Sequence, residues 1–490
     1  MNHIIKHLKT FGAVLALGIL LPSCGDFLEE NPKDRIAVSN YYTTEEAAIS
    51  AVNSIYAHLN GQSGDSFGGV YFGGIWVAPG LASDEMVNLQ AGAPDQDQLA
   101  TFSWNPENGM LYEIWKQHYK AITLANIAIA RIPSINMNEG TRDRLVNEAK
   151  FLRGLLYFNL VRMFGNIPLL VNEVESPTPE TASVDAIYAQ IISDLQAAES
   201  LPWEQPEGRG KATAGAAKAI LAKVYLTRGN WSDAALKCEE VINSNRYELF
   251  ENFADIFKIV NRGLKEAIFS VGFGTNNGKI IFWEISQMHV RLLPPELTAA
   301  GVTSNTLGWT GPSQSLADSY LPQDERRNAT VFNAFNETVN GVDYNVPFSR
   351  YYFRKYWDVT DPDEFTTSTT ADNDFPVIRY ADVLLMYAEA LNELGDADAA
   401  HDALNEVRSR AGLAGLGGLS KEAFRTALLE ERKLEFAAEG HRWFDLVRFG
   451  KLEEVVPAAK PGVAPQAKHY LFPIPQRERD LNSNLPQNDF

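Results

Sequence analysis

The stretch from Ala381 to Val407, ADVLLMYAEALNELGDADAAHDALNEV, decides the fold. Apolar residues recur at three- and four-residue steps on both sides of Gly395, the pattern of two amphipathic helices. Glycine ends the first helix well, because it adopts the left-handed backbone conformation without strain. We therefore predict a helical hairpin here, with alanine where the two helices approach each other.

A second segment, from Ala217 to Val241, reads AKAILAKVYLTRGNWSDAALKCEEV and repeats this arrangement. Setting Gly229 against Gly395 aligns three further pairs: Ala222 with Ala388, Ala234 with Ala400, and Val241 with Val407. Such helix pairs are typical of tetratricopeptide-like repeats, which stack because one pair cannot bury its own apolar faces. Two matches predict hairpins of this kind, but they do not establish a regular solenoid.

Helical periodicity extends over most of the chain. Residues 111–131 and 142–163 are long enough for several turns each, and the second run stops near Gly165. An earlier helix is expected to begin at Thr43–Glu46, where a threonine can cap the helix and the acids suit its N-terminus. The predicted fold class is therefore all-α, or mostly helical.

Two regions lack this periodicity. Residues 61–110 and 252–376 are rich in glycine, asparagine, proline and aromatic residues. Irregular segments of this length within a compact protein usually carry function. We expect them to form a loop-rich face supported by the helices.

The N-terminus has the pattern of a secretory signal. Lys6 and Lys9 precede an apolar run from Phe11 to Leu21, which is too short to span a membrane. The run ends in Leu-Pro-Ser-Cys, and we predict that residues 1–23 are a lipoprotein signal peptide and that Cys24 carries lipid. Two or three acyl chains on that residue would make a durable anchor. The alternative is an ordinary signal peptide followed by a chance cysteine.

Composition excludes several classes of protein. The net charge is −19 without a basic cluster, which argues against binding of nucleic acid or of anionic lipid surfaces. Cys238, the only other cysteine, falls within a helical pattern, so we expect a small buried side chain and no internal disulfide.

Three C-terminal and one N-terminal motif resemble those of the SusD/RagB family. They are IRYADVLLMYAEA at 378–390, LEERKLEFAAEGHRWFDLVR at 429–448, LFPIPQRERDLNSNLPQ at 471–487 and CGDFLEENP at 24–32. In this resemblance, residues 24–250 form the N-terminal part with tetratricopeptide-like helices. Residues 251–490 form the C-terminal part, with the loop-rich binding region and the signature helices.

The resemblance implies both a place and a partner. Members of the SusD/RagB family have four tetratricopeptide-like hairpins and are outer-membrane lipoproteins of Bacteroidota that bind glycans or other nutrients. They work as a lid over a SusC-like TonB-dependent transporter. Asp26, Glu29 and Glu30 resemble a surface-export signal, although Gly25 interrupts the acidic run. We therefore expect a lipid-anchored chain that faces the extracellular side.

Sugar binding needs flat aromatic faces beside fixed hydrogen-bonding groups. The irregular regions contain this mixture, and the candidate ligand-binding residues are, in order, Trp309, Trp76, Trp283 and Tyr71, with Asp84 nearby. Each tryptophan is also a candidate for packing. Three others lie in helical patterns and are expected in the core: Trp115, Trp231 and Trp443.

Catalytic and metal motifs are weak. Glu431 falls within an apolar helical stripe and needs a cation, for which we expect Arg442 or Arg448. An acid beside His441 could suggest acid–base chemistry, but a structural ion pair explains the same residues. Asp84 and Glu85 are adjacent, whereas glycoside hydrolysis needs carboxylates on opposite sides of the scissile bond. The acidic run at 358–374 does not match an EF-hand and is expected to be a solvated loop. No metal or cofactor is predicted.

The sequence thus predicts a surface glycan-binding lipoprotein without catalytic activity, which delivers an oligosaccharide to its transporter. One alternative is a protein of the same fold that binds peptides or another nutrient. A less favoured alternative is a surface glycoside hydrolase.

Overall fold

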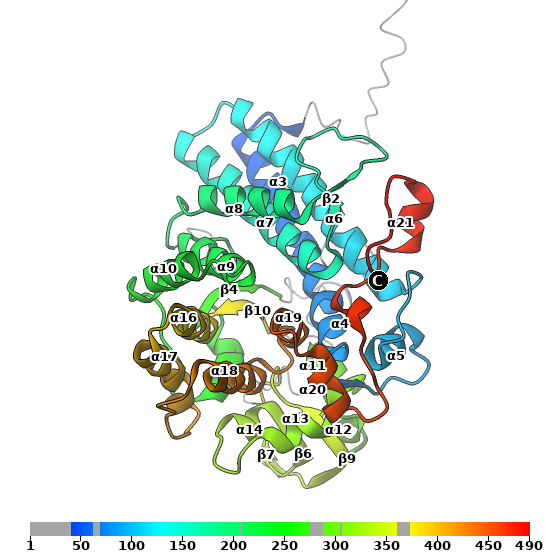
Figure 1. Cartoon of the computed structure of the whole chain (residues 1–490), viewed down its shortest axis with the longest axis vertical. Helices are drawn as coiled ribbons and strands as arrows, with labels where there is room; N and C mark the ends of the chain where they lie inside the picture. Colours follow the sequence, from blue (N-terminus) through cyan, green and yellow to red (C-terminus); the bar gives the residue numbers. More distant parts are fainter. Residues whose placement is uncertain (1–40, 62–68, 205–207, 274–287, 304–305, 360–372) are drawn as a thin grey trace, which may run out of the picture.

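Helices dominate the protein, as the sequence predicts (Figure 1). The computed structural model describes residues 41–61, 69–204, 208–273, 288–303, 306–359 and 373–490. The longer helices are α3 (Glu45–Asn60), α6 (Gly109–Arg131), α7 (Glu139–Phe164), α8 (Val184–Ala198), α9 (Ala214–Thr227), α10 (Trp231–Ile242), α16 (Tyr380–Leu394), α17 (Ala397–Arg410) and α18 (Lys421–Phe436). The shorter ones are α4 (Ile75–Leu81), α5 (Pro94–Thr101), α11 (Met288–Leu292), α12 (Pro295–Ala299), α13 (Gln314–Ser319), α14 (Arg326–Thr330), α19 (Arg442–Arg448), α20 (Leu452–Ala459) and α21 (Gln476–Leu481).

The hairpins predicted at 217–241 and 381–407 are α9–α10 and α16–α17. Gly229 and Gly395 adopt positive φ angles of 72° and 92°, as the turn between the two helices requires. All six aligned alanine and valine side chains are completely buried: Ala222, Ala234, Val241, Ala388, Ala400 and Val407. The small residues therefore lie where the helices pack closely.

The helix pairs form a continuous stack. Helix α3 packs along α6, α7 packs against α8, and α10 packs against α16, which joins the two predicted hairpins (Figure 1). Thr44 caps α3, since the backbone N–H of Ala47 donates to its Oγ1 at 3.2 Å. The stack buries one large apolar core that includes residues from Ala48 to Leu485.

The chain also contains short helical turns and two-stranded ladders, most of them in the irregular regions. The turns are the π-helix η2 (Val70–Gly74) and the 3₁₀ helices η3 (Ile132–Ser134), η4 (Phe253–Phe257), η5 (Ile259–Asn261) and η6 (Ala467–Tyr470). The antiparallel ladders pair β1 (Met86–Asn88) with β5 (Thr310–Pro312), β2 (Ile167–Pro168) with β3 (Thr181–Ala182), β4 (Ala267–Val271) with β10 (Phe375–Arg379), β6 (Val331–Phe335) with β9 (Val346–Phe353), and β7 (Thr338–Val339) with β8 (Val342–Asp343). A smaller apolar cluster, which includes Phe335 and Trp357, lies under β6 and β9.

Buried ion pairs join the loop-rich region to the signature helices. Arg326 of α14 pairs with Glu431 and Glu435 of α18, at 2.6 and 3.1 Å. Arg379 at the end of β10 pairs with Glu439 just beyond α18, at 2.9 Å. Because a buried charge without its partner is costly, these pairs hold the loop-rich region against the C-terminal helices.

Within the described ranges, no helix combines the length and the apolar character that a membrane span requires.

Candidate functional site

The two irregular regions meet at the β1–β5 ladder. Val87 pairs with Gly311, and the N–H of Leu89 donates to the carbonyl of Trp309 at 2.8 Å. A groove of about 880 Å³ lies beside this ladder. It is lined by η2, by the segments around α5 and the start of α6, by Arg291 and Trp309, and by residues 475–480. We call this the loop groove.

Trp309 is fixed at the edge of the loop groove. Its own backbone N–H donates to the carbonyl of Arg291 at 2.6 Å, so both its main-chain polar groups are engaged. The Arg291 guanidinium carbon lies 4.8 Å from the centre of the Trp309 ring. The tryptophan is nevertheless partly exposed, so the groove contains an aromatic side chain whose position is set before any ligand binds.

Arg291 brings a positive charge to the loop groove without an ion-pair partner among the described residues. Its guanidinium lies 5.6 Å from the ring centre of Phe72 and against Gly73, and its Nε makes no hydrogen bond there. Burial lowers the pKa of Arg291 to about 10, which still leaves the group charged at neutral pH. A half-buried cation and two aromatic rings therefore lie side by side.

The polar lining comes mostly from amides and carboxylates. Gln96 donates to Gln90 at 2.6 Å, and Gln117 donates to Glu113 at 3.3 Å. The remaining Oε1 atoms of Gln96 and Gln117 are buried and have no hydrogen-bond partner in the described structure. Tyr112 adds a further aromatic ring, with the Arg477 guanidinium 4.9 Å from its centre. The groove thus places aromatic rings beside amide and carboxylate side chains.

Glycines allow η2 to pack tightly behind the groove. A Cβ on Gly74 would lie 2.7 Å from Cγ1 of Ile114 on α6, which is closer than real side chains come. A π-helical turn is a frequent device at functional sites. Here it places Val70 and Phe72 in the lining of the loop groove.

Trp76 is not available to a ligand, contrary to the sequence-based expectation. It has no exposed surface, and it packs against Phe375 with ring centres 6.3 Å apart. The reason is that α4 continues directly from η2 and lies inside the apolar core. Trp76 is therefore a core residue, as are Trp115 and Trp443, whereas Trp231 packs partly buried against the core.

Tyr71 and Asp84 are buried as well and do not line the loop groove. The Tyr71 hydroxyl accepts a hydrogen bond from Asn159 at 3.2 Å, and burial raises the pKa of Tyr71 to about 12. Asp84 accepts two hydrogen bonds from Arg442, at 2.6 and 2.9 Å. Burial alone would raise the pKa of Asp84, but the Arg442 guanidinium outweighs it and holds the pKa below its usual value. Asp84 therefore has a structural ion pair in place of the expected ligand contact.

Of the expected site residues that the structure describes, only Trp309 lines the loop groove. Trp283 and the lipidation candidate Cys24 lie outside the described residues, as does most of the acidic run at 358–374. The groove residues that the sequence did not single out include Arg291, Tyr112 and Gln117. Tyr112 and Gln117 belong to the helical pattern of α6, and a helical period indicates which positions are buried but not what they face.

Glu431 has the structural role that its apolar stripe indicates, but with different cations. It pairs with Arg326 and Arg408, at 2.6 and 2.8 Å, and not with Arg442 or Arg448. His441 is held neutral near physiological pH, because burial and then the neighbouring Lys223 lower its pKa to about 3. A neutral histidine in this position is a poor match for the acid–base alternative.

The described residues contain no group of three or more histidine, cysteine, aspartate or glutamate side chains placed to hold a metal ion.

Comparison with known proteins gives a consistent result. A model of the SusD family matches residues 331–490, and a family model described as starch-binding associating with outer membrane matches residues 81–226. SusD-like protein P25 of Formosa agariphila is 30% identical over 518 residues, which cover 95% of each chain. The starch-binding protein SusD of Bacteroides thetaiotaomicron is 24% identical over 84% of each chain.

Solved structures are similar over nearly the whole length. A SusD superfamily protein from Bacteroides vulgatus superposes with a TM-score of 0.79 at 26% identity, covering 92% of this chain and all of the other. A laminarin-binding SusD-like protein superposes with a TM-score of 0.77 at 28% identity, covering 91% of this chain and 99% of the other. The chain therefore belongs to the SusD family.

Proposed function

We propose that this protein binds an oligosaccharide in the loop groove, with Trp309 as the stacking platform, and passes it to a SusC-like TonB-dependent transporter. The observation that carries this proposal is the partly exposed Trp309, which is fixed by two backbone hydrogen bonds in a groove of about 880 Å³. A groove of that volume lies within the range of ligand-binding clefts, roughly 300–1,000 Å³.

The lining suits a sugar in chemical terms. A pyranose ring stacks its C–H face on an indole, and its hydroxyls both donate and accept hydrogen bonds. Gln96, Gln117 and Arg291 all line the groove, so a ligand rich in hydroxyls finds amide and guanidinium groups to bond with there. A purely apolar ligand would make no use of these groups.

The relatives support a glycan in preference to a peptide. One related protein is a starch-binding SusD and one similar structure is a laminarin-binding SusD-like protein. Starch and laminarin oligosaccharides are therefore the first ligands to test. Which glycan this chain prefers depends on groove residues such as Arg291 and Tyr112.

Delivery of the bound sugar to a transporter is supported by the expected location of the chain. Lipid on Cys24 and the acidic residues Asp26, Glu29 and Glu30 would tether the chain at the outer face of the outer membrane. A matching family model is itself described as associating with the outer membrane. From that position the protein would hold captured sugar at the entrance of the transporter.

We propose binding without catalysis. The adjacent acids Asp84 and Glu85 are both buried, and neither lines the loop groove. Burial and the charge of Asp84 raise the pKa of Glu85 to about 8, but an acid without access to substrate cannot protonate a leaving group. The groove itself serves to hold and orient the chain of sugars.

Calorimetry on the full chain tests the proposal. The titrants are starch and laminarin oligosaccharides, other neutral and acidic oligosaccharides, and peptides of similar length, and release of reducing ends is measured in parallel. We expect saturable binding of at least one oligosaccharide and no new reducing ends. Binding of peptides alone would identify a peptide receptor of the same fold. Steady release of reducing ends would identify a hydrolase.

A further inference from the structure

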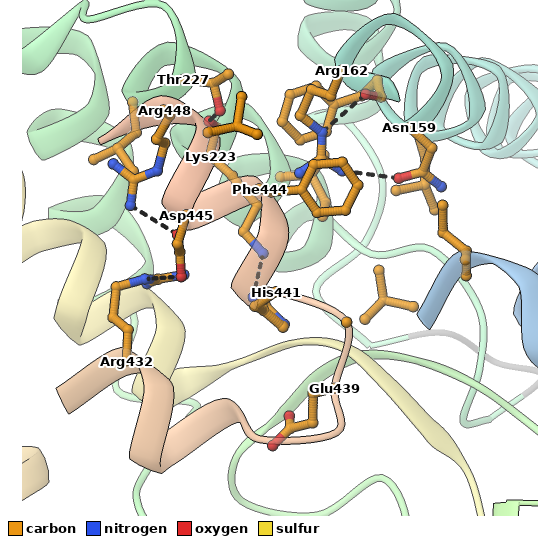
Figure 2. Close-up of a pocket in the computed structure, with 18 of the residues that line it drawn as sticks. Asn159, Arg162, Lys223, Thr227, Arg432, Glu439, His441, Phe444, Asp445 and Arg448 are labelled. Carbon is orange, nitrogen blue, oxygen red and sulfur yellow. Dashed lines mark hydrogen bonds and ion pairs between the residues drawn. The ribbon is translucent and has the colours of Figure 1, made fainter. Parts of the chain in front are cut away.

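A second cavity, of about 280 Å³, lies between α7, α9 and α19. It shares no lining residue with the loop groove, but η2 separates the two: Tyr71 lines the cavity, whereas Val70 and Phe72 line the groove. Figure 2 shows the side chains of Arg162, Lys223 and Phe444 around it. We call it the helix cavity.

No carboxylate among the described residues forms an ion pair with Arg162. Its guanidinium lies between two aromatic rings, 3.8 Å from the centre of Phe158 and 4.1 Å from that of Phe444. Nε donates to the Phe158 carbonyl and Nη2 to Oδ1 of Asn159, both at 3.0 Å. Burial lowers the pKa of Arg162 to about 10, so the group is still a cation at neutral pH. Its Nη1 makes no hydrogen bond within the described structure.

The other cations of the lining are balanced. The closest pairs are Lys223 with Asp382 at 2.6 Å, Arg432 with Asp445 at 2.8 Å, and Arg448 with Glu389. Arg432 and Arg448 each reach a second carboxylate, Asp382 and Asp445 respectively. Three cations thus share three carboxylates, and the charge of Arg162 is left over.

The remaining titratable groups of the lining do not change this balance. Glu439 also lines the helix cavity, but its carboxylate pairs with Arg379 and Lys355, at 2.9 and 2.8 Å, which do not line it. His441 stays neutral because burial, and then Lys223, lower its pKa to about 3. The phenols Tyr71 and Tyr188 have pKa values raised by burial and are neutral too. The helix cavity therefore has one uncompensated positive charge.

Most of the remaining lining is apolar and aromatic. Ile75, Tyr188, Phe375 and Leu226 face the same space as the Arg162 guanidinium. A planar guanidinium matches a carboxylate, whereas the apolar walls suit a hydrocarbon or ring body. We propose that the helix cavity binds a small organic monocarboxylate, with its carboxylate on Arg162 and its apolar body against these walls. The volume is near the lower limit for ligand pockets, about 300 Å³, so the ligand is small.

The test uses the full chain and matched pairs of probes. Acetate, butyrate, hexanoate, benzoate and phenylacetate are titrated beside their neutral amides and beside inorganic phosphate, with binding followed by ligand-observed NMR. The variants are Arg162→Gln, Thr227→Trp, which fills the cavity from the end of α9, and the control Arg142→Gln, which alters a partly exposed residue of the same helix. Thr227→Trp tests the site even if Arg162→Gln folds poorly.

We expect one of the larger carboxylates to bind, and its amide to bind about tenfold more weakly or worse. Arg162→Gln and Thr227→Trp should each lower the affinity by about tenfold or more, whereas Arg142→Gln should leave it unchanged. The proposal is overturned if no carboxylate binds at millimolar concentration, or if carboxylate and amide bind equally. Binding of phosphate alone, or binding that persists in Arg162→Gln and Thr227→Trp, also overturns it. None of these outcomes depends on the loop groove.

Discussion

Arg442 donates hydrogen bonds from Nε and Nη2 to the two carboxylate oxygens of Asp84, across 358 residues of sequence. The pair joins the loop just before β1 to the signature helix α19, and both side chains are buried. The Asp84 carbonyl also accepts from the Ser313 hydroxyl at 2.5 Å, next to β5. The ion pair and this hydrogen bond together hold the β1–β5 ladder against α19.

Asp84→Ala should destabilise the protein. It leaves the Arg442 guanidinium buried without its partner, and such losses cost about 3–5 kcal/mol. Urea unfolding measures the change. Asp185→Ala is the control, because Asp185 is 81% exposed in its pair with Arg228 and should contribute about 1 kcal/mol or less. Equal losses in the two variants would contradict the structural role of Asp84.

Trp76→Ala and Trp309→Ala should differ in stability. Trp76 is fully buried, and removal of a buried tryptophan costs about 3–5 kcal/mol through lost apolar contact and the cavity that remains. Trp309 is partly exposed at the loop groove, so its removal should leave the thermal midpoint close to that of the wild type. Differential scanning calorimetry compares the two. A stable Trp76→Ala variant would show that α4 is not part of the core.

Glu85 should make the protein less stable as the pH rises from about 5 to 8. Its pKa is raised to about 8 by burial and by Asp84, so the folded state keeps a proton that the unfolded state has released. The contribution of Glu85 to the free energy of unfolding is fully present below the pKa of the unfolded state. It is lost as the pH rises through the pKa of the folded state, by up to ~1.4 kcal/mol per pH unit. Glu85→Gln should remove this slope from urea unfolding at pH 5, 6.5 and 8. An identical slope in wild type and variant would refute the assignment.

Arg162→Met should be tolerated where Arg432→Met is not. Arg162 is a half-buried cation without a carboxylate partner among the described residues, so replacing it removes a desolvation cost and should change the free energy of unfolding by about 1 kcal/mol or less. Arg432 pairs with Asp382 and Asp445, and its loss should cost about 3–5 kcal/mol. Parallel urea titrations of the two variants and the wild type measure the two losses in the free energy of unfolding. Equal losses would mean that Arg162 is a structural cation like Arg432.

The helical framework was predictable because its signals are local. Gly229 and Gly395 ended helices where the spacing indicated, and the alanines aligned between them are buried. The stripe that contains Glu431 required a buried cation, and the structure provides two. Each inference needed only helical periodicity and the cost of burying a charge.

The binding groove was harder to predict because it depends on distant pairings. The partner of β1 is β5, more than two hundred residues away, and no periodicity indicates that register. The same composition of glycine and aromatic residues surrounds Trp76 and Trp309, yet α4 buries one and β5 presents the other. No sequence pattern indicated Arg291 as a groove residue, because what distinguishes it is that no carboxylate among the described residues pairs with it.

The central claim is that Trp309 in the loop groove binds sugar. The chain offers a matched control, because Trp203 is also partly exposed and also has an arginine, Arg246, over its ring at 5.7 Å. Trp203 lines a different cavity, with Arg209 and Tyr247. The two tryptophans therefore share their local chemistry and differ in location.

The most direct measurement is calorimetric titration of the best-bound oligosaccharide into wild type, Trp309→Ala and Trp203→Ala. Loss of one stacked ring should cost about 1–3 kcal/mol, which lowers affinity by roughly five- to 150-fold. We predict that Trp309→Ala shows this loss and that Trp203→Ala binds like the wild type. Unchanged affinity in Trp309→Ala, or an equal loss in both variants, would contradict the assignment of the loop groove.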